Sequence, residues 1–189
     1  MTSKNKNLFK VLTGVCFATI ALAIQAFSSS KEAKSMAKRV EPVTNAGPIN
    51  SNEINSHLRN SIESFGMDLL GTPYVYGSCS REAFDCSGFV YFVFRNFDIE
   101  VPRSTSQFEK FGKEVSIDSV KKGDIHVFLS PTMDAIGHVG IVTKANGMES
   151  DFVQASSSKE MKVVISSLKQ EGYKRRFVKA INVLGDSGG

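Results

Sequence analysis

The residues best suited to chemistry in this chain are Cys86 and His138. Asp85 precedes Cys86 and an apolar run begins at Phe89, which predicts that Cys86 opens a helix capped by Asp85. The macrodipole and the free backbone N–H groups of a first helical turn favour the thiolate, the nucleophilic form of cysteine. His138 begins an alternating stretch, residues 138–142, that is typical of a strand. A helix-borne thiol facing a strand-borne imidazole predicts nucleophilic thiol catalysis.

Elimination among the three histidines selects His138 as the base. His57 lies beside the apolar stripe of a predicted helix and is expected to be a solvated surface residue. His126 shares a predicted strand face with Asp124 and Phe128, and we interpret it as a structural residue or one at the edge of the cleft. His138 is flanked by glycines, which allow the backbone to approach closely. Gln154, on the next predicted strand, can orient the imidazole; the alternative is a solvent-facing glutamine on an edge strand.

The spacing of apolar residues predicts the helices and strands that position these residues. A helix is predicted from near Asn50 to Gly71, and its apolar face consists of Ile54, Leu58, Ile62, Phe65 and Leu69. A second helix runs from Cys86 to about Phe97, and a short one from Pro102 to about Phe111. Strands are predicted near residues 124–129, 137–144, 152–155, 161–165 and 176–184. The fold class is therefore α+β, with N-terminal helices packed on an antiparallel sheet of about five strands.

The charge distribution argues against a nucleic-acid partner. The formal net charge is +4, and residues 1–56, with seven Lys/Arg and three Asp/Glu, carry all of it. Residues 57–189 contain sixteen residues of each sign and are neutral. A basic face that grips phosphates is therefore not indicated, and no phosphate-binding glycine motif is present.

The N-terminus has the pattern of a secretory signal. Three lysines precede an apolar stretch at 11–27, and small residues follow it. The alternative is a retained signal anchor, which would place the protein at a membrane. Residues 13–15 before Cys16 make a poor lipoprotein box, so no lipid anchor is expected. We therefore expect export to the periplasm, the cell envelope or the exterior.

The predicted organisation is a signal at 1–28, a flexible linker at 29–49, a catalytic domain at 50–185 and a short tail at 186–189. Cys79 and Cys86 could form a disulfide, but that bond would consume the proposed nucleophile. Their spacing is also a weak metal pattern. We interpret Cys86 as catalytic and expect no metal ion and no organic cofactor.

Several motifs in register resemble the NlpC/P60 cell-wall cysteine peptidases. The match covers about residues 55–185, and the motifs are 74–77, 84–89, 101–104, 122–124, 138–141 and 154–157. The resemblance implies a papain-like fold and hydrolysis of stem peptides of peptidoglycan, usually between γ-D-glutamate and a diamino acid. We expect the protein to be a monomer. One alternative is an N-acetylmuramoyl-L-alanine amidase on the same fold. Another is a non-catalytic cell-wall-binding protein.

The resemblance also implies roles for individual residues. Cys86 would be the nucleophile and His138 the general base, and Gln154 occupies the third polar position, where histidine is more common. Tyr74 matches a tyrosine near the oxyanion. Asp85 and Ser87 match residues that line the substrate cleft, and Arg103 matches an arginine at the side of the cleft.

Overall fold

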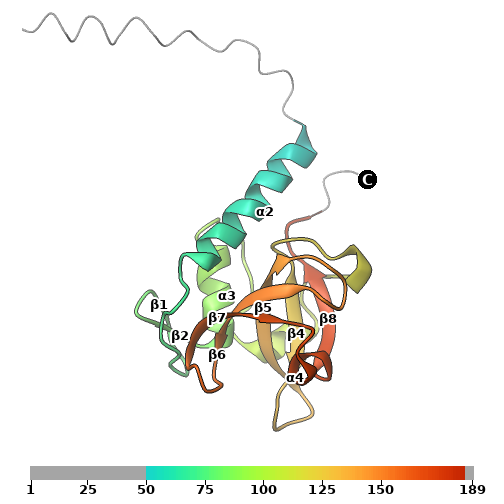
Figure 1. Cartoon of the computed structure of the whole chain (residues 1–189). Helices are drawn as coiled ribbons and strands as arrows, with labels where there is room; N and C mark the ends of the chain where they lie inside the picture. The colour runs from blue at the N-terminus through green and yellow to red at the C-terminus, as the bar shows by residue number, and fades with distance from the viewer. Residues whose placement is uncertain (1–49, 186–189) are drawn as a thin grey trace, which may run out of the picture. The chain divides into compact units, whose positions relative to one another are not determined.

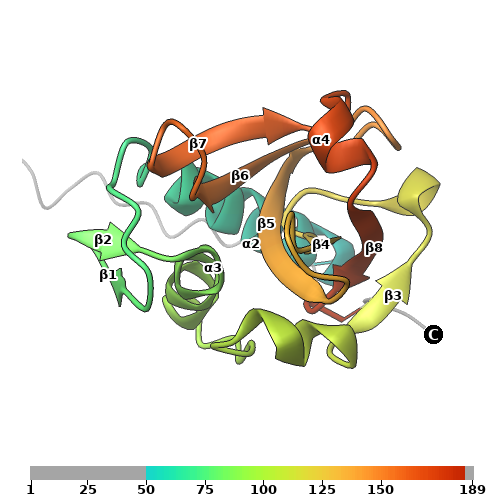
Figure 2. The same ribbon diagram turned by 90° about the horizontal axis from the view of Figure 1, so that it is seen from below.

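The computed structural model describes residues 50–185. Its main sheet has six strands in the order β3-β8-β4-β5-β6-β7, and every neighbouring pair is antiparallel (Figure 2). The strands are β3 (Lys113–Val115), β4 (Ile125–Leu129), β5 (Ile136–Lys144), β6 (Asp151–Ser156), β7 (Lys162–Ser167) and β8 (Phe177–Asn182). The central strands β4, β5 and β6 therefore have a hydrogen-bonded neighbour on both sides.

The helices lie mostly before the sheet in the chain, as Figure 1 shows. They are α2 (Ser51–Met67), α3 (Cys86–Arg95), α4 (Glu171–Lys174) and two 3₁₀ helices, η1 (Thr105–Glu109) and η2 (Ile117–Ser119). A two-stranded hairpin, β1 (Cys79–Ser80) with β2 (Ala83–Phe84), leads into α3. The Asn50 side chain caps α2, and the Asp85 carboxylate caps α3 by accepting a 2.6 Å hydrogen bond from the Gly88 N–H.

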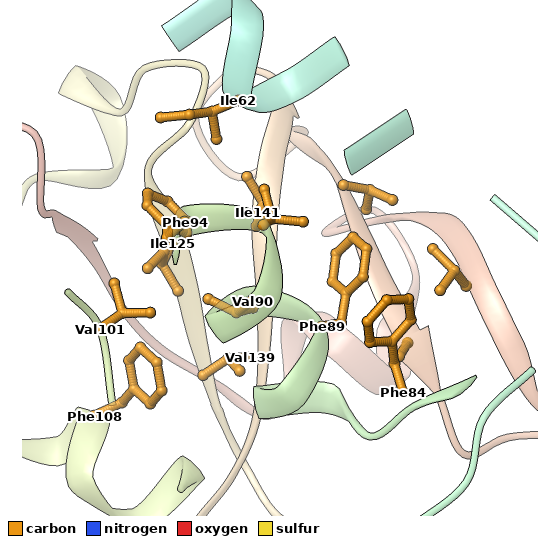
Figure 3. Packing of buried hydrophobic residues seen from close by; sticks show 14 of the residues in the cluster. Ile62, Phe84, Phe89, Val90, Phe94, Val101, Phe108, Ile125, Val139 and Ile141 are labelled. Atoms are coloured by element: carbon orange, nitrogen blue, oxygen red, sulfur yellow. The ribbon is translucent and has the colours of Figure 1, made fainter. Parts of the chain in front are cut away.

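The main core forms where α3 packs on the sheet. Phe89, Val90 and Phe94 of α3 are fully buried against Val139 and Ile141 of β5 (Figure 3). Burying each such side chain is worth roughly 1.5–3 kcal/mol. This packing fixes α3, which begins at Cys86, against β5, the strand that carries His138.

An ion pair connects α2 to the residue that directly precedes the central strand β4. The buried Arg59 guanidinium lies 2.8 Å from the Asp124 carboxylate. It also donates to the Lys122 carbonyl at 2.7 Å and to the Asn182 side chain at 3.1 Å. Burial raises the pKa of Asp124, and the Arg59 hydrogen bond opposes that rise. The arginine thus compensates a carboxylate that would otherwise be unpaired in the interior.

The predicted α+β class is confirmed, and each of the five predicted strands is present within a few residues of its expected bounds. The sheet has six strands instead of five because the short edge strand β3 was missed. Its three residues are too few to show an alternating pattern. The β1–β2 hairpin was missed for the same reason.

Three helix predictions need correction. Helix α2 ends at Met67, before Gly71, and α3 ends at Arg95, before Phe97. The predicted apolar face of α2 wrongly includes Ile54, which is 54% exposed because the first turns of α2 extend past the core. The short helix after Pro102 is the 3₁₀ helix η1.

The predicted signal, linker and tail (1–49 and 186–189) lie outside the described residues. Within residues 50–185, no helix has the length and apolar character required to span a membrane.

Candidate active site

The structure brings the Cys86 thiol to the strand that carries His138. Cys86 is the first residue of α3, and its Sγ lies 3.9 Å from the carbonyl oxygen of Gly137 on β5. Gly137 directly precedes His138. The packing of α3 on β5 therefore places the Cys86 thiol beside the backbone of the residue that precedes His138.

The Cys86 thiol is neutral at pH 7. Its pKa is raised to about 11, first by burial and then by the Asp85 carboxylate. The backbone N–H groups of Ser87 and Cys86 lower it, in the direction predicted for a helix start. Burial outweighs them, so the thiol stays neutral in the free protein although the helix start favours the thiolate.

His138 is buried on β5 and is also neutral at pH 7. Burial lowers its pKa to about 4, the hydrogen bond with Gln154 raises it, and the Arg176 charge lowers it. The ring Nε2 pairs with Gln154 Oε1 on β6. The Phe128 ring lies 5.8 Å from the imidazole, centroid to centroid. The imidazole is therefore held by a polar partner and an aromatic wall.

Gly137 and Gly140 allow neighbouring residues to lie close to the β5 backbone on either side of His138, as the sequence predicted. A Cβ on Gly137 would lie 2.6 Å from Ser130 Cβ, and one on Gly140 would lie 2.5 Å from the Phe152 ring. No side chain fits at either position without moving its neighbour.

Gln154 occupies the place predicted for the residue that orients the imidazole. It is fully buried on β6, which lies between β5 and β7, so the edge-strand alternative is wrong. Its amide Nε2 donates to Ser166 Oγ at 2.7 Å and to the Tyr173 hydroxyl. A buried amide with partners on both of its polar atoms has a fixed orientation.

Tyr74 lies close enough to Cys86 for their charges to interact. Burial raises the pKa of Tyr74, and the charges of Cys86 and Asp85 raise it further. The Tyr74 backbone N–H donates to the Met161 carbonyl at 2.8 Å, which ties the loop before β1 to the turn before β7. The Tyr74 phenol therefore lies within electrostatic range of Cys86.

Asp85, Ser87 and Arg103 form one hydrogen-bonded cluster. Both carboxylate oxygens of Asp85 lie 2.9 Å from the Arg103 guanidinium. The carboxylate also accepts from the backbone of Gly77 at 3.0 Å and caps α3. Arg103 donates to Ser87 Oγ at 3.3 Å and to the Gly77 carbonyl at 2.8 Å. The acceptor capacity of Asp85 is therefore already used within the protein.

Sequence reasoning missed Ser166 and Tyr173, which contact Gln154, and Arg176, which acts on His138. No spacing pattern links them to the catalytic motifs, because Ser166 lies on β7, Tyr173 on α4 and Arg176 between α4 and β8. Cys79 and Cys86 are both free thiols. Among residues 50–185, no group of three His, Cys, Asp or Glu side chains could hold a metal ion.

His126 belongs to a second core and not to the site. It is fully buried on β4, and neither ring nitrogen has a hydrogen-bond partner in the described part of the chain. Its ring lies 5.4–6.1 Å from those of Phe128, Phe152 and Phe177. Burial lowers the pKa of His126 to about 3. The exposed His57 lies on α2, as predicted.

The buried His126 should make the protein less stable in acid. Its pKa is about 3 in the folded protein, against about 6.5 in an unfolded chain. The unfolded state therefore binds more protons as pH falls below about 6.5, and stability is lost there by up to about 1.4 kcal/mol per pH unit. We expect His126→Phe to reduce the loss between pH 7 and 4.5 by about 2 kcal/mol, measured by urea unfolding. Identical pH slopes for the two proteins would contradict this.

The chain is similar to several known proteins. The model of the NlpC/P60 family matches residues 71–182. The chain is 32% identical to the murein DD-endopeptidase MepS/murein LD-carboxypeptidase of Escherichia coli K12, over 94% of this chain and 95% of that protein. It is 40% identical to the γ-D-glutamyl-L-lysine dipeptidyl-peptidase of Bacillus subtilis 168, over 40% of this chain and 26% of that protein.

The fold is likewise shared with solved structures. A crystal structure of an NlpC/P60 family protein from Bacillus cereus aligns with a TM-score of 0.61 at 24% identity, over 67% of this chain and 40% of that one. The predicted papain-like fold and the resemblance drawn from the motifs are both confirmed. The chain belongs to the NlpC/P60 family.

Proposed function

We propose that this protein is a cysteine endopeptidase that cleaves stem peptides of peptidoglycan with Cys86 as nucleophile and His138 as base. As a member of the NlpC/P60 family it is a hydrolase, and its matched relatives are named as murein and γ-glutamyl peptidases. The observation that carries the residue assignment is the placement of the Cys86 thiol 3.9 Å from the residue before His138. The Gln154 contact with His138 supports it.

The mechanism starts from two neutral groups. Gln154 engages His138 Nε2, so Nδ1 is the ring atom that takes the Cys86 proton as Sγ attacks the scissile carbonyl carbon. The Cys86 N–H and the Tyr74 hydroxyl stabilise the oxyanion, each worth about 3–4 kcal/mol in comparable sites. His138 then protonates the leaving amine and activates the water that releases the acyl group from Cys86. The steps use only side chains, backbone N–H groups and water.

The scissile bond that we propose joins γ-D-glutamate to the diamino acid. The names of two B. subtilis relatives support this bond, a γ-D-glutamyl-L-lysine dipeptidyl-peptidase and a γ-DL-glutamyl hydrolase. A second candidate is the D,D bond of a peptide cross-link, because the E. coli relative that aligns over 94% of this chain is named a DD-endopeptidase.

Digestion of purified sacculi, followed by mass spectrometry of the products, tests this function. Cleavage at γ-D-glutamate leaves dipeptide stems on the glycan, whereas D,D cleavage converts cross-linked dimers to monomers with intact stems. An amidase would leave muramic acid free of peptide. A protein that only binds the wall would release nothing.

Asp85 offers a test of how the stem peptide is recognised. A carboxylate at this place could receive the free amine of an unattached stem, but its oxygens are occupied by Arg103 and by backbone N–H groups. We therefore expect Asp85→Asn to lower kcat/KM equally for free-amine peptides and for glycan-linked stems, by about tenfold, because it removes the charge that pairs with Arg103 next to Cys86. A selective loss on free-amine peptides would show instead that Asp85 binds the amine.

Gln154 offers a test of the imidazole contact. Gln154→Ala should lower kcat about tenfold or more, because the His138 ring loses the polar partner that holds it. Gln154→His should retain substantial activity, since a histidine nitrogen can accept from the same ring N–H. Hydrolysis of a stem tetrapeptide measures both rates. An unchanged rate for the alanine variant would mean that another group orients His138.

We also propose that the protein is exported and acts in the cell envelope or outside the cell. The lysine-rich start and the apolar stretch at 11–27 support this, together with a wall substrate that lies outside the cytoplasm. N-terminal sequencing of the exported protein tests it. A start between about residues 24 and 30 indicates cleavage, and a retained Met1 in membranes indicates a signal anchor.

A further inference from the structure

We propose that Ser166 and Tyr173 are positioning residues that hold the Gln154 amide in one orientation and so select the tautomer of His138. The inference rests on the proposed function, in which His138 is the base. In the selected tautomer the proton is on Nε2, and Nδ1 is free to accept the proton of Cys86.

Three elements converge on one buried amide. Gln154 projects from β6 and is fully buried. Its Nε2 donates to Ser166 Oγ on β7 at 2.7 Å and to the Tyr173 hydroxyl on α4. Its Oε1 faces His138 Nε2 on β5. In this orientation both N–H hydrogens and the carbonyl oxygen of the amide have a partner.

A reversed amide would satisfy fewer groups. Turning Gln154 over would place Oε1 against the two hydroxyls, which can donate to it, and Nε2 against His138. Only one amide hydrogen would then have an acceptor, and a buried N–H without an acceptor is costly. The two hydroxyls therefore favour the observed orientation as a pair. Either hydroxyl alone would leave one amide hydrogen unpaired in both orientations.

The orientation of the amide decides the protonation of the ring. A carbonyl oxygen only accepts, so Oε1 stabilises a proton on His138 Nε2 and leaves a lone pair on Nδ1. A reversed amide would donate to Nε2 and stabilise the proton on Nδ1, where it blocks acceptance from Cys86. The hydroxyl pair thus controls how much of the protein holds a competent base.

The Tyr173 hydroxyl is itself held in place by packing. The Tyr173 ring lies 5.1 Å from that of Phe152 and 5.5 Å from that of Phe128, centroid to centroid. The Arg176 guanidinium lies 5.1 Å from the centre of the Tyr173 ring. Arg176 is fixed in turn by the carbonyls of Gly172 at 2.8 Å and Leu129 at 3.1 Å. Removing the hydroxyl alone therefore leaves the ring where it is.

The test compares Tyr173→Phe and Ser166→Ala with matched controls. Tyr91→Phe removes a hydroxyl that contacts Arg95 on the outside of α3, and Ser167→Ala removes the neighbouring hydroxyl on β7. We expect kcat to fall about tenfold in each test variant, a barrier increase of about 1.4 kcal/mol, with KM unchanged. Both controls should keep the wild-type kcat.

A spectroscopic readout separates positioning from mere stability. The ¹⁵N shifts of the His138 ring, measured at pH 7 in a Cys86→Ala background, report which nitrogen carries the proton. We expect the Nε2–H pattern in the parent, and a mixture of the two tautomers after Tyr173→Phe or Ser166→Ala. This measurement needs no turnover, so it tests the inference even if the proposed reaction is wrong.

A rescue experiment isolates the role of amide orientation. Gln154→Glu replaces the amide by a carboxylate with two acceptor oxygens, so turning it over changes nothing. In that background, Tyr173→Phe should lower kcat less than about twofold, against about tenfold in the parent. The inference is overturned if both hydroxyl variants keep the wild-type tautomer and kcat, or if the Tyr173→Phe loss is equally large in the Gln154→Glu background. Full activity of His138→Ala would instead overturn the proposed function.

Discussion

A Cys86→Ser variant is expected to lose nearly all hydrolysis of stem peptides while keeping the wild-type fold. The substitution exchanges one atom at the first position of α3, so the Asp85 cap and the packing on β5 are unchanged. A serine hydroxyl is far harder to deprotonate than a thiol, and the neutral His138 is a weak base for it. Loss of a nucleophile of this kind lowers kcat by about 10³-fold or more. Product release from sacculi, followed by mass spectrometry, measures the loss.

Cys79→Ser is the matched control for this experiment. Cys79 is also a half-buried free thiol, and its Sγ donates to the Gly88 carbonyl at 3.3 Å. A serine can make the same bond, so activity should stay within about twofold of the wild type. Retention of more than a few per cent activity by Cys86→Ser would refute the nucleophile assignment. Loss of activity in Cys79→Ser alone would identify Cys79 as the nucleophile.

An Arg59→Met variant is expected to lose about 3–5 kcal/mol of stability, which is the usual cost of breaking a buried ion pair from one side. The Asp124 carboxylate would lose the counter-charge that lies 2.8 Å away in the wild type, while still buried. Urea unfolding at pH 7 measures the change. The effect on activity should be secondary and follow the fraction of folded protein.

Two further variants test whether the unpaired Asp124 carboxylate causes the loss of stability in Arg59→Met. Arg59→Met combined with Asp124→Leu removes both charges, and it should recover much of the lost stability because no unpaired carboxylate remains. Lys169→Met breaks an ion pair with Glu149 at 3.1 Å, in which both side chains are about 60% exposed, and should cost less than about 1 kcal/mol. If the double variant were no more stable than Arg59→Met, the loss would come from packing of the arginine stem and not from the unpaired charge.

The two neutral groups of the site have a consequence for how the thiol is activated. Burial holds the Cys86 pKa near 11 and the His138 pKa near 4, so the free protein does not store a thiolate–imidazolium pair. In the mechanism that we propose, proton transfer to His138 therefore accompanies the attack on the substrate. The transfer then requires the His138 tautomer with a free Nδ1. The contacts of Gln154 matter because they favour that tautomer.

Local sequence rules were sufficient for the parts of the site that depend on neighbours in the chain. Asp85 caps the helix that Cys86 opens, because a short acceptor side chain before an apolar run satisfies free N–H groups. The alternation around His138 and around Gln154 indicated strands, and antiparallel neighbours place such residues side by side. The choice of His138 over His57 and His126 needed only their sequence contexts. The five longer strands and the α+β class followed from the same periodicities.

The tertiary structure decided everything that depends on burial and on partners distant in the chain. The pKa values of Cys86 and His138 are set mainly by loss of solvent, which a helix start or a strand pattern does not reveal. The pairing of Arg59 with Asp124 joins residues 65 positions apart, and no periodicity marks a buried arginine on a helix. Ser166 and Tyr173 reach Gln154 only because β7 pairs with β6 and α4 lies close to the same amide. Sequence patterns record which face of an element is apolar, whereas electrostatics and hydrogen bonding inside the protein depend on which elements meet.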